Sequence, residues 1–272
     1  MTFVVEVPIE NSFDKIGCRK APKEIINHFP NSYFSELNKE LNKEAINFKK
    51  IGEPSTDIKN MVELIKDKSK EFILSSGEAE KIVFLGGDHS LTYSTLSSFF
   101  EYCNDLDEES FLIVFDAHAD CKKHTSNGEN YPNNTQWLRK IIDDGFPTDR
   151  IILAGLRNLT NEENSFLVEN NIRCYRMKDM FDFQEICDII MELANKFKIY
   201  ISIDIDVVDS AFVPGTANPE TGGLTSRQLF YFIQRLNLLK GIKVFDIVEI
   251  NPDKDINNIT LDLAVKLLGE II

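Results

Sequence analysis

The chain has 272 residues, of which 43% are hydrophobic and 27% are charged. This composition is sufficient for a sizeable buried core and is typical of an ordinary globular protein. Acidic residues outnumber basic ones by 44 to 30, and the formal net charge of -14 disfavours nucleic acids and anionic membrane surfaces as partners. Cationic substrates remain compatible with this charge.

The first residues contain a short apolar run without a basic leader or a small-residue cleavage pattern, and no apolar run in the chain reaches about 18 residues. We therefore expect a cytoplasmic protein. The five cysteines are scattered and form no C-x-x-C pair, which is typical of reduced thiols in a cytosolic protein.

Short apolar runs predict strands, and several segments between them have helical spacing. In chain order, the strands are expected at 2–8, 81–87, 110–118, 150–156, 172–176, 197–206 and 243–250. Helices are expected at 58–76, 90–103, 160–171 and 226–239, the last of them starting at a capping box of Thr225 and Gln228. This alternation predicts an α/β fold: a single domain over 1–272, built as a three-layer sandwich with a mainly parallel central sheet and helices on both faces.

A long loop is expected between the strand at 197–206 and the helix at 226–239. Residues 207–224 are rich in Pro and Gly, and they follow the carboxyl end of a strand, where open α/β sheets usually bind ligands.

Three of the expected strands end in acidic residues or histidine. If the backbone stays extended, Asp204 and Asp206 project from one face roughly 7 Å apart, and the polar residues of DAHAD also share a face. Burying adjacent carboxylates is costly unless cations or donors lie between them. The residues concerned are Asp88 and His89 in GGDHS, Asp116, His118 and Asp120 in DAHAD, and Asp204 and Asp206 in ISIDID.

Parallel strands would bring these ends to one edge of the sheet, where two histidines and at least four carboxylates make a plausible site for two divalent cations. Oxygen-rich ligation with some imidazole suits Mn²⁺ better than the thiolate-rich sites of structural zinc. Each residue alone could be a helix cap or a solvated loop residue, so the prediction depends on the joint pattern. The chain has neither G-x-x-x-x-G-K-[ST] nor G-x-G-x-x-G, which disfavours nucleotide binding.

With GGDHS, DAHAD and SIDIDVVDSAFVPGTANPETGGLT together, the sequence resembles the arginase/agmatinase (ureohydrolase) family, and it looks closer to agmatinase-like members than to true arginases. The resemblance runs from the opening VVEVP to VFDIVEINP near the end. It implies a hydrolase with two Mn²⁺ per subunit, often assembled as trimers or hexamers. Two such cations lower the pKa of a water held between them and yield hydroxide near neutral pH.

The resemblance also implies roles for individual residues. Asp116 and Asp204 would bridge the cations and count among the candidate catalytic residues. Glu249 would pair with the substrate guanidinium, unless it is only an exposed residue at a strand end. Asp209 is expected to hold loop backbone. One cation would be held by His89, Asp116, Asp120 and Asp204, and the other by Asp116, His118, Asp204 and Asp206.

The chain departs from the family at a histidine downstream of the DAHxD motif, which is assigned there to proton shuttling or substrate contact. Asn133 stands at that position, and asparagine cannot shuttle a proton. The leaving amine must then be protonated by solvent, by another residue or only slowly. His124 is the remaining histidine near the site in sequence and is a candidate catalytic substitute, and the alternative is a histidine of a surface loop, since nothing else in the sequence constrains its direction.

A second departure concerns the substrate. Asn158 and Thr160 stand where arginases carry two aspartates, so free arginine is disfavoured relative to agmatine, another guanidino compound or an arginine-containing peptide. Asn133, Asn158 and Glu249 are the candidate substrate-binding residues. The leading prediction is cleavage of a guanidino C–N bond to urea and an amine. Two alternatives are a formimidoyl or amidine hydrolase such as formimidoylglutamase, and a metal-binding relative without turnover.

Overall fold

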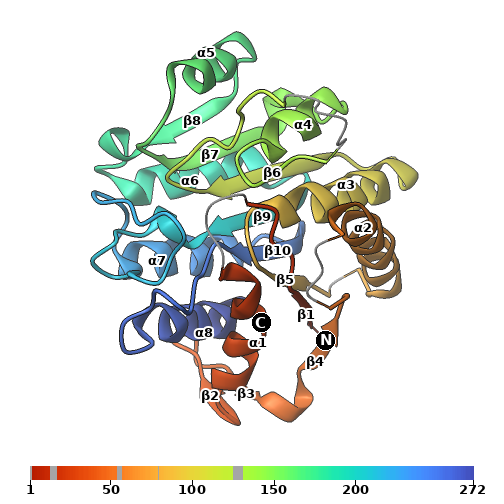
Figure 1. Cartoon of the computed structure of the whole chain (residues 1–272), viewed down its shortest axis with the longest axis vertical. Coiled ribbons are helices and arrows are strands. Elements are labelled where there is room, and N and C mark those ends of the chain that lie inside the picture. The colour runs from red at the N-terminus through yellow and green to blue at the C-terminus, as the bar shows by residue number, and fades with distance from the viewer. Residues whose placement is uncertain (1, 13–16, 54–56, 79, 125–130) are drawn as a thin grey trace.

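In the computed structural model, the residues described are 2–12, 17–53, 57–78, 80–124 and 131–272. An eight-stranded sheet crosses the molecule in the order β4-β1-β5-β10-β9-β6-β7-β8, and each of its neighbouring pairs is parallel (Figure 1). Its strands are β1 (Phe3–Val7), β4 (Asn47–Lys50), β5 (Ile82–Gly86), β6 (Ser110–Phe115), β7 (Ile151–Leu156), β8 (Arg173–Arg176), β9 (Lys198–Asp204) and β10 (Ile242–Val248). A separate antiparallel pair consists of β2 (Ser32–Phe34) and β3 (Glu40–Asn42).

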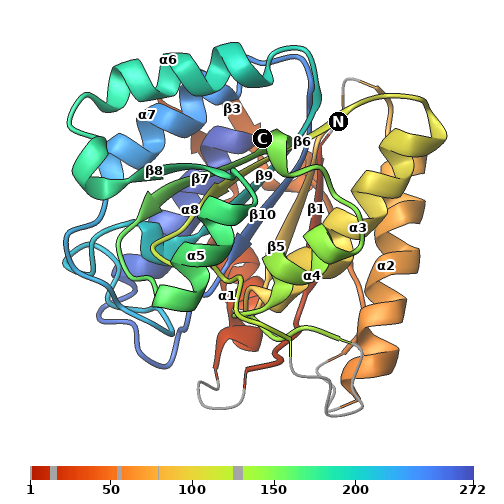
Figure 2. The ribbon, with the colours of Figure 1, turned by 90° about the horizontal axis from the view of Figure 1, so that it is seen from above.

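Helices cover both faces of the large sheet (Figure 2). The helices are α1 (Ala21–His28), α2 (Ile58–Ser75), α3 (Ser90–Asp105), α4 (Trp137–Asp143), α5 (Asn161–Glu169), α6 (Phe183–Ala194), α7 (Ser226–Leu236) and α8 (Ile259–Ile271). Short 3-10 turns occupy Cys18–Lys20, Lys43–Ala45, Thr148–Arg150, Met177–Asp179 and Ile205–Val207.

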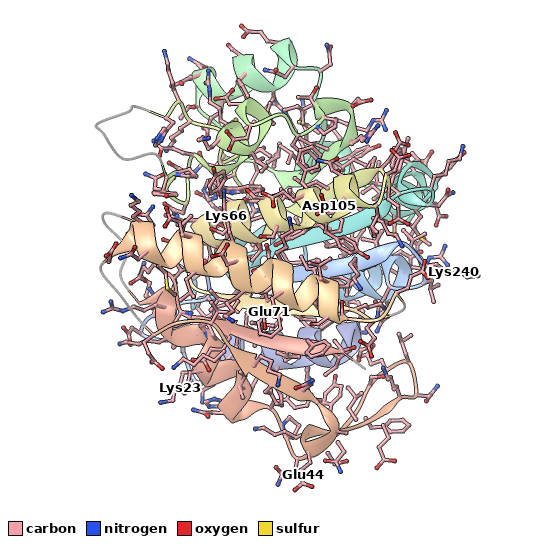
Figure 3. The ribbon with its side chains drawn as sticks, turned by 90° about the vertical axis from the view of Figure 1, so that its right-hand side faces the viewer. Lys23, Glu44, Lys66, Glu71, Asp105 and Lys240 are labelled. Atoms are coloured by element: carbon pink, nitrogen blue, oxygen red, sulfur yellow. The ribbon has the colours of Figure 1, made fainter. Side chains whose placement is uncertain are left out.

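The core lies in two layers, one on each side of the sheet. Side chains of α1, α6, α7 and α8 pack with one set of strand residues, and those of α2, α3, α4 and α5 pack with the other set. In β9, for example, Ile201 faces the first layer and Tyr200 the second, because successive side chains of a strand alternate. Figure 3 looks onto the α2 and α3 side, with Lys66 and Glu71 on α2. The predicted three-layer α/β sandwich is confirmed.

All seven expected strands and all four expected helices are present, with ends shifted by a few residues. The capping box is also confirmed, because the Thr225 hydroxyl oxygen accepts from Gln228 N while the Gln228 side chain accepts from Thr225 N. Within the described ranges, no helix is long and apolar enough to cross a membrane.

The expectation of extended backbone through the acidic strand ends is wrong. β6 ends at Phe115 and β9 at Asp204, which is followed by a 3-10 turn. In both places an aspartate binds the backbone two residues ahead: Asp116 Oδ1 accepts from His118 N at 2.6 Å, and Asp204 Oδ1 accepts from Asp206 N at 2.9 Å. Such local hydrogen bonds favour a turn over a continuing strand.

Sheet order explains why distant segments meet. β5, β10, β9 and β6 are consecutive neighbours in the middle of the sheet, and all run in the same direction. Their carboxyl ends therefore open at one edge. The segments that leave these four strands carry the candidate site residues His89, Glu249, Asp204 with Asp206, and Asp116 to Asp120.

Candidate functional site

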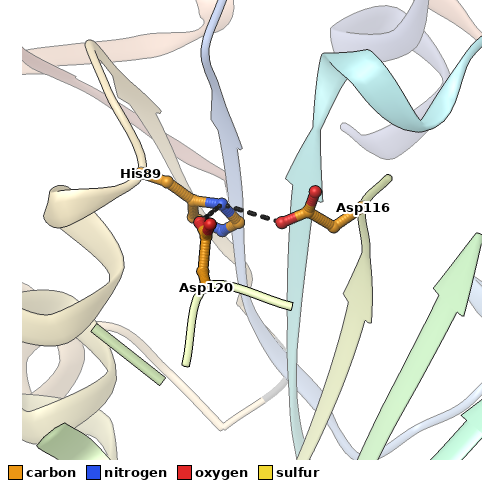
Figure 4. A group of neighbouring side chains, drawn as sticks. All are labelled: His89, Asp116 and Asp120. Atoms are coloured by element: carbon orange, nitrogen blue, oxygen red, sulfur yellow. Dashed lines mark ion pairs between the residues drawn. The ribbon is translucent and has the colours of Figure 1, made fainter. Parts of the chain in front are cut away.

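The first group of candidate ligands gathers around His89, which precedes α3 and is completely buried. Its Nδ1 lies 3.2 Å from Asp116 Oδ2, 3.0 Å from Asp120 Oδ2 and 3.3 Å from Asp204 Oδ2. Figure 4 shows the ion pairs that join His89 to Asp116 and to Asp120. Three carboxylates from two segments thus converge on one imidazole nitrogen.

A second group shares Asp116 with the first. His118 Nδ1 lies 3.0 Å from Asp206 Oδ2 and 3.6 Å from Asp116 Oδ1. One ligand atom each from His89, Asp116 and Asp120 lies within 4.8 Å of the others, and the same holds for Asp116, His118 and Asp206. All six predicted ligands are therefore brought together at the sheet edge, with Asp116 in both groups and Asp204 beside His89.

The donor atoms fit divalent cations because several of them have no other partner. His89 Nδ1, Asp116 Oδ2 and Asp206 Oδ2 are buried and have no hydrogen-bond partner among the described residues. Buried polar atoms normally have such a partner, and leaving them without one is costly. His89 and Asp116 belong to the first group, and Asp116 and Asp206 belong to the second, so one cation in each group would satisfy these atoms.

The pKa values of the clustered acids and of His118 also favour bound cations. Burial, and then repulsion from Asp206 and Asp116, raises the pKa of Asp204 well above its usual range. Burial and Asp116 likewise raise the pKa of Asp206. For His118, burial acts to lower the pKa, but Asp116 and Asp206 outweigh it and raise the pKa to about 12. Added positive charge would therefore stabilise the ionised forms of Asp204 and Asp206, and the His118 imidazole lies among negative charges.

A chain of hydrogen bonds fixes the orientation of His89. Its Nε2 lies 2.9 Å from Ser202 Oγ, and the Ser202 hydroxyl donates to Asp246 Oδ1 at 2.7 Å. Asp246 also accepts hydroxyl hydrogen bonds from Thr92 and Tyr200. Because the Ser202 hydrogen is committed to Asp246, Nε2 must donate to Ser202, which leaves the Nδ1 lone pair for a cation.

Trp137 supports the same group from α4. Its indole Nε1 donates to Asp120 Oδ2 at 3.1 Å, and its ring lies 4.8 Å from the His89 ring, centroid to centroid. Asp120 itself has a positive φ of 50°. Both ligands are therefore held by a large, fully buried side chain.

Glu249 follows β10 and is 3% exposed, so the alternative of an exposed strand-end glutamate is wrong. Its Oε1 accepts from His89 N at 2.9 Å and from Asn134 Nδ2 at 3.2 Å, while the Cys18 thiol lies 3.8 Å from Oε2. Burial, and then repulsion from Asp88, raises the pKa of Glu249 to about 8. A cationic group beside Glu249 would stabilise its ionised form.

A cavity of about 540 Å³ opens over these residues, and its lining includes Asp120, Asp204 and Glu249. Asn133 and Asn158 also line it, as the sequence-based assignment of substrate contacts would require. Asn133 Oδ1 accepts from Thr135 N and Oγ1 and so shapes its own loop. Asn158 Nδ2 lies 2.5 Å from Glu220 Oε1.

His124 is not among the described residues that line this cavity. Its Nδ1 is 3.2 Å from Gln136 Oε1, which also accepts from Asn133 N. Among the described residues that line the cavity, His118 is the histidine present. Its Nε2 is 3.4 Å from Glu220 Oε1.

Asp209 and Arg157 make several hydrogen bonds to the backbone of the loop at 207–224. Asp209 accepts from the backbone N–H groups of Ala211, Gly222 and Gly223, which confirms its predicted structural role. The Arg157 guanidinium donates to backbone carbonyl oxygens of Gly155, Asp206, Val207, Val208, Glu220 and Thr221.

Sequence reasoning missed several residues that complete the site. Ser202 lies on the same face of β9 as Asp204. Asp246 is an isolated acid inside the apolar strand β10. The sequence therefore contains a signal for both residues. Asn134 follows Asn133, a predicted substrate contact. The sequence contains no signal for Arg157 or Glu220, because their partners are far away in the chain.

Comparison with known proteins places the fold and the site in context. Residues 2–272 match the arginase family. A 32.2 kDa protein of Methanothermus fervidus is 32% identical over 199 residues, which span 73% of this chain and 64% of that relative. An agmatinase of Pyrococcus horikoshii is 32% identical over 215 residues, covering 79% of this chain and 68% of the relative.

Among solved structures, formimidoylglutamase from Bacillus subtilis superposes with a TM-score of 0.86 at 23% identity, covering 99% of this chain and 84% of that one. At this identity the likeness concerns the fold. The match over residues 2–272, together with the convergent histidine and aspartate motifs, leads to one assignment: the chain belongs to the arginase family.

Proposed function

We propose that this chain is a manganese-dependent hydrolase that cleaves a guanidino C–N bond to give urea and an amine. The substrate would be agmatine, a related guanidino compound or arginine within a peptide. The observation that carries the proposal is a set of buried ligand atoms, of His89, Asp116 and Asp206, that have no hydrogen-bond partner in the described part of the chain. They belong to groups that share the site with cavity-lining residues, Glu249 among them. The similarity to an agmatinase supports it.

The proposed metal ligands form two overlapping sets. His89, Asp116, Asp120 and Asp204 would hold one Mn²⁺, and Asp116, His118, Asp204 and Asp206 the other. Carboxylate oxygens with some imidazole are a donor set that suits Mn²⁺. Bound there, the two cations would supply activation of water, whose pKa falls beside divalent ions so that hydroxide is available near neutral pH.

The protein's own residues would bind and orient the substrate. Glu249 would accept hydrogen bonds from the planar guanidinium, while Asn133 and Asn158 would contact the substrate further out. The oxygen of one water molecule would add to the guanidinium carbon, and the bond between that carbon and the alkyl-bearing nitrogen would break. Both hydrogens of the water would end on the departing nitrogen, which leaves as an alkylammonium group. The products are urea and an amine.

Asn133 cannot deliver this proton, since an amide does not ionise near neutral pH. His124 remains the proposed donor, and its Nδ1 lies 3.2 Å from Gln136 Oε1. Replacement of His124 by Ala tests this role. An unchanged turnover rate would dismiss it.

We propose a cytoplasmic homo-oligomer, a trimer or hexamer, with small cationic guanidino compounds or arginine peptides as partners and without nucleic-acid or membrane partners. Light scattering on the purified protein tests the oligomeric state.

The decisive experiment loads purified protein with Mn²⁺ and screens agmatine, arginine, guanidinobutyrate, guanidine, formiminoglutamate and an arginine peptide, following urea, ammonia and formamide. We expect urea from at least one guanidino compound. Formamide in the absence of urea would identify a formimidoyl hydrolase instead. Bound metal without any turnover would identify a non-catalytic relative.

An Asp206→Ala variant supplies the matched test of the metal site. We expect loss of turnover and of about one Mn²⁺ per chain in elemental analysis, because Asp206 Oδ2 and His118 Nδ1 belong to one group. Full activity with two ions retained would contradict the proposed ligand set.

A further inference from the structure

The backbone of Glu249 is held from several directions. Its φ is 64°, in the left-handed region that residues other than glycine rarely adopt. Its N donates to Gly87 O at 2.8 Å, and its O accepts from Ala217 N at 3.2 Å and from Thr216 Oγ1 at 3.0 Å. A backbone of this kind persists only where its surroundings hold it, and such places cluster at functional sites. With the backbone fixed, the direction of the carboxylate depends on the side-chain torsions.

Two neutral donors fix these torsions through one oxygen. Glu249 Oε1 accepts from His89 N at 2.9 Å and from Asn134 Nδ2 at 3.2 Å. A carboxylate oxygen has about two lone-pair positions, so both positions of Oε1 are occupied. Oε2 has the Cys18 thiol at 3.8 Å, which is a long contact with a weak donor. Oε2 is therefore the oxygen of Glu249 with room for an N–H group of a ligand.

The loop that carries Asn134 is held by other groups. Asn133 Oδ1 accepts from Thr135 N and from Thr135 Oγ1, both at 3.0 Å, and Gln136 N donates to Asn133 O at 3.1 Å. The Asn134 side chain takes no part in these bonds. It is buried and lines the cavity, as Glu249 does. A substitution at Asn134 therefore changes the surroundings of Glu249 more than the course of the loop.

We propose that Asn134 is a positioning residue: it holds Glu249 Oε1, so that Oε2 alone receives the planar cation of the substrate. This inference rests on the proposed function, in which Glu249 binds the guanidinium. A fork-to-fork pair, with one N–H on each carboxylate oxygen, would require Asn134 Nδ2 or His89 N to leave Oε1. The cation is therefore bound at one oxygen, and the strength of that contact depends on how firmly Asn134 holds the carboxylate.

The kinetic test replaces Asn134 by Leu, which removes the donor at similar volume. Glu249 is expected to contact the cation equally in the ground state and in the transition state, so a misplaced carboxylate raises KM and leaves kcat nearly constant. We expect KM for agmatine and for guanidinobutyrate to rise about tenfold, the size of one hydrogen bond to a charged group, while the Mn²⁺ content stays constant.

Two further variants calibrate this result. Asn134→Gln keeps an amide donor and should give a smaller rise in KM than Asn134→Leu. Asn170→Leu is the matched control, because Asn170 Nδ2 donates to Phe166 O at 2.8 Å at the end of α5, outside the described cavity lining. We expect wild-type KM and kcat from the control.

A binding measurement keeps this inference separate from the proposed function, because it requires no turnover. Calorimetric titration of guanidinium chloride into Mn²⁺-loaded protein gives Kd for the wild type, Asn134→Leu, Glu249→Gln and the double variant. Because Asn134 acts through Glu249, Asn134→Leu should weaken binding about tenfold in the wild-type background and little in the Glu249→Gln background. This outcome supports the inference even if no compound is hydrolysed and the proposed function fails.

Other outcomes overturn the inference while the proposed function stands. These are wild-type KM and Kd in Asn134→Leu, an equal loss of binding in both backgrounds, or a lower kcat at constant KM. Should Asn134→Leu fail to fold, Asn134→Ala repeats the same measurements. A crystal structure of the guanidinium complex adds a direct check: an N–H on Oε2 with Asn134 Nδ2 still on Oε1 supports the inference, and N–H groups of the ligand on both oxygens contradict it.

Discussion

Glu249 is a buried carboxylate that its protein neighbours satisfy with neutral donors: the His89 N–H, the Asn134 amide and the Cys18 thiol. Glutamine has nearly the same shape and can still accept from His89 N, so Glu249→Gln removes charge and little else. We expect kcat/KM for a guanidino substrate to fall about 100-fold, equivalent to roughly 2–3 kcal/mol, while the metal content stays constant.

Steady-state kinetics and elemental analysis check this prediction together. Glu162→Gln is the matched control, because Glu162 is exposed and pairs with Arg139 at 3.5 Å outside the site. A Glu249→Gln variant with the wild-type kcat/KM would show that the substrate cation binds elsewhere.

The orientation of His89 depends on Ser202, whose hydroxyl connects the ring to the buried Asp246. Ser202→Ala leaves the Nε2–H without an acceptor and frees the ring to rotate or change tautomer. Loss of such an outer partner typically costs about 10- to 100-fold in metal affinity. Titration of metal into the metal-free variant should show this loss at one site, and Ser98→Ala, a buried serine elsewhere on α3, should show none.

At the scale of elements, the strands could be predicted because apolar runs fully buried in a parallel sheet carry their own signal. β4 could not, because it is a short edge strand with exposed lysines. The turn after Asp204 was also missed, because alternation predicts a face only while the backbone is extended, and an aspartate that binds the next turn's N–H ends that extension.

The candidate metal ligands were accessible to sequence reasoning since each lies in a short motif at a strand end. The residues that support these ligands could not be predicted in the same way. Glu220 reaches His118, and Arg157 reaches the loop at 207–224, through contacts between segments that no local pattern relates. Sequence therefore predicted which residues meet, and the structure adds what holds them.

Arg157 joins the end of β7 to the 3-10 turn at Ile205–Val207 and to the loop at 207–224. Its Nη2 donates to Asp206 O at 2.6 Å and to Glu220 O at 3.1 Å, and its Nε donates to Thr221 O at 3.0 Å. Arg157→Met keeps much of the side-chain volume but leaves these carbonyl oxygens without their donor. Each lost hydrogen bond costs about 1 kcal/mol, so we expect a loss of up to roughly 3 kcal/mol in the free energy of unfolding.

Urea denaturation measures this loss, and limited proteolysis should show faster cleavage within 207–224. Arg150→Met is the control, since Arg150 pairs with the exposed Glu109 and a surface ion pair contributes about 1 kcal/mol or less. Equal stability of the two variants would mean that the loop is held without Arg157.

For the whole molecule, the clustered acids make stability depend on cations. Asp204 and Asp206 lie at the centre of the sheet edge. Burial, and then repulsion from Asp206 and Asp116, raises the pKa of Asp204, and burial, and then repulsion from Asp116, raises the pKa of Asp206. Without cations the folded protein therefore retains protons on these groups that the unfolded chain would release. Cation binding to the folded state displaces those protons and satisfies the buried ligand atoms.

We expect Mn²⁺ to raise the Tm relative to chelator-treated protein. At a free concentration 100 times Kd, one site contributes about 2.7 kcal/mol, which corresponds to roughly 5–10 °C for a chain of this size. Protons compete with the cation for Asp204 and Asp206, so the gain should shrink as the pH falls from about 8 to about 6. Scanning calorimetry with Mn²⁺ or chelator at both pH values measures it. Asp206→Ala should keep part of the gain, because the ligands around His89 remain; a gain that grows toward acid pH would place the cation away from these carboxylates.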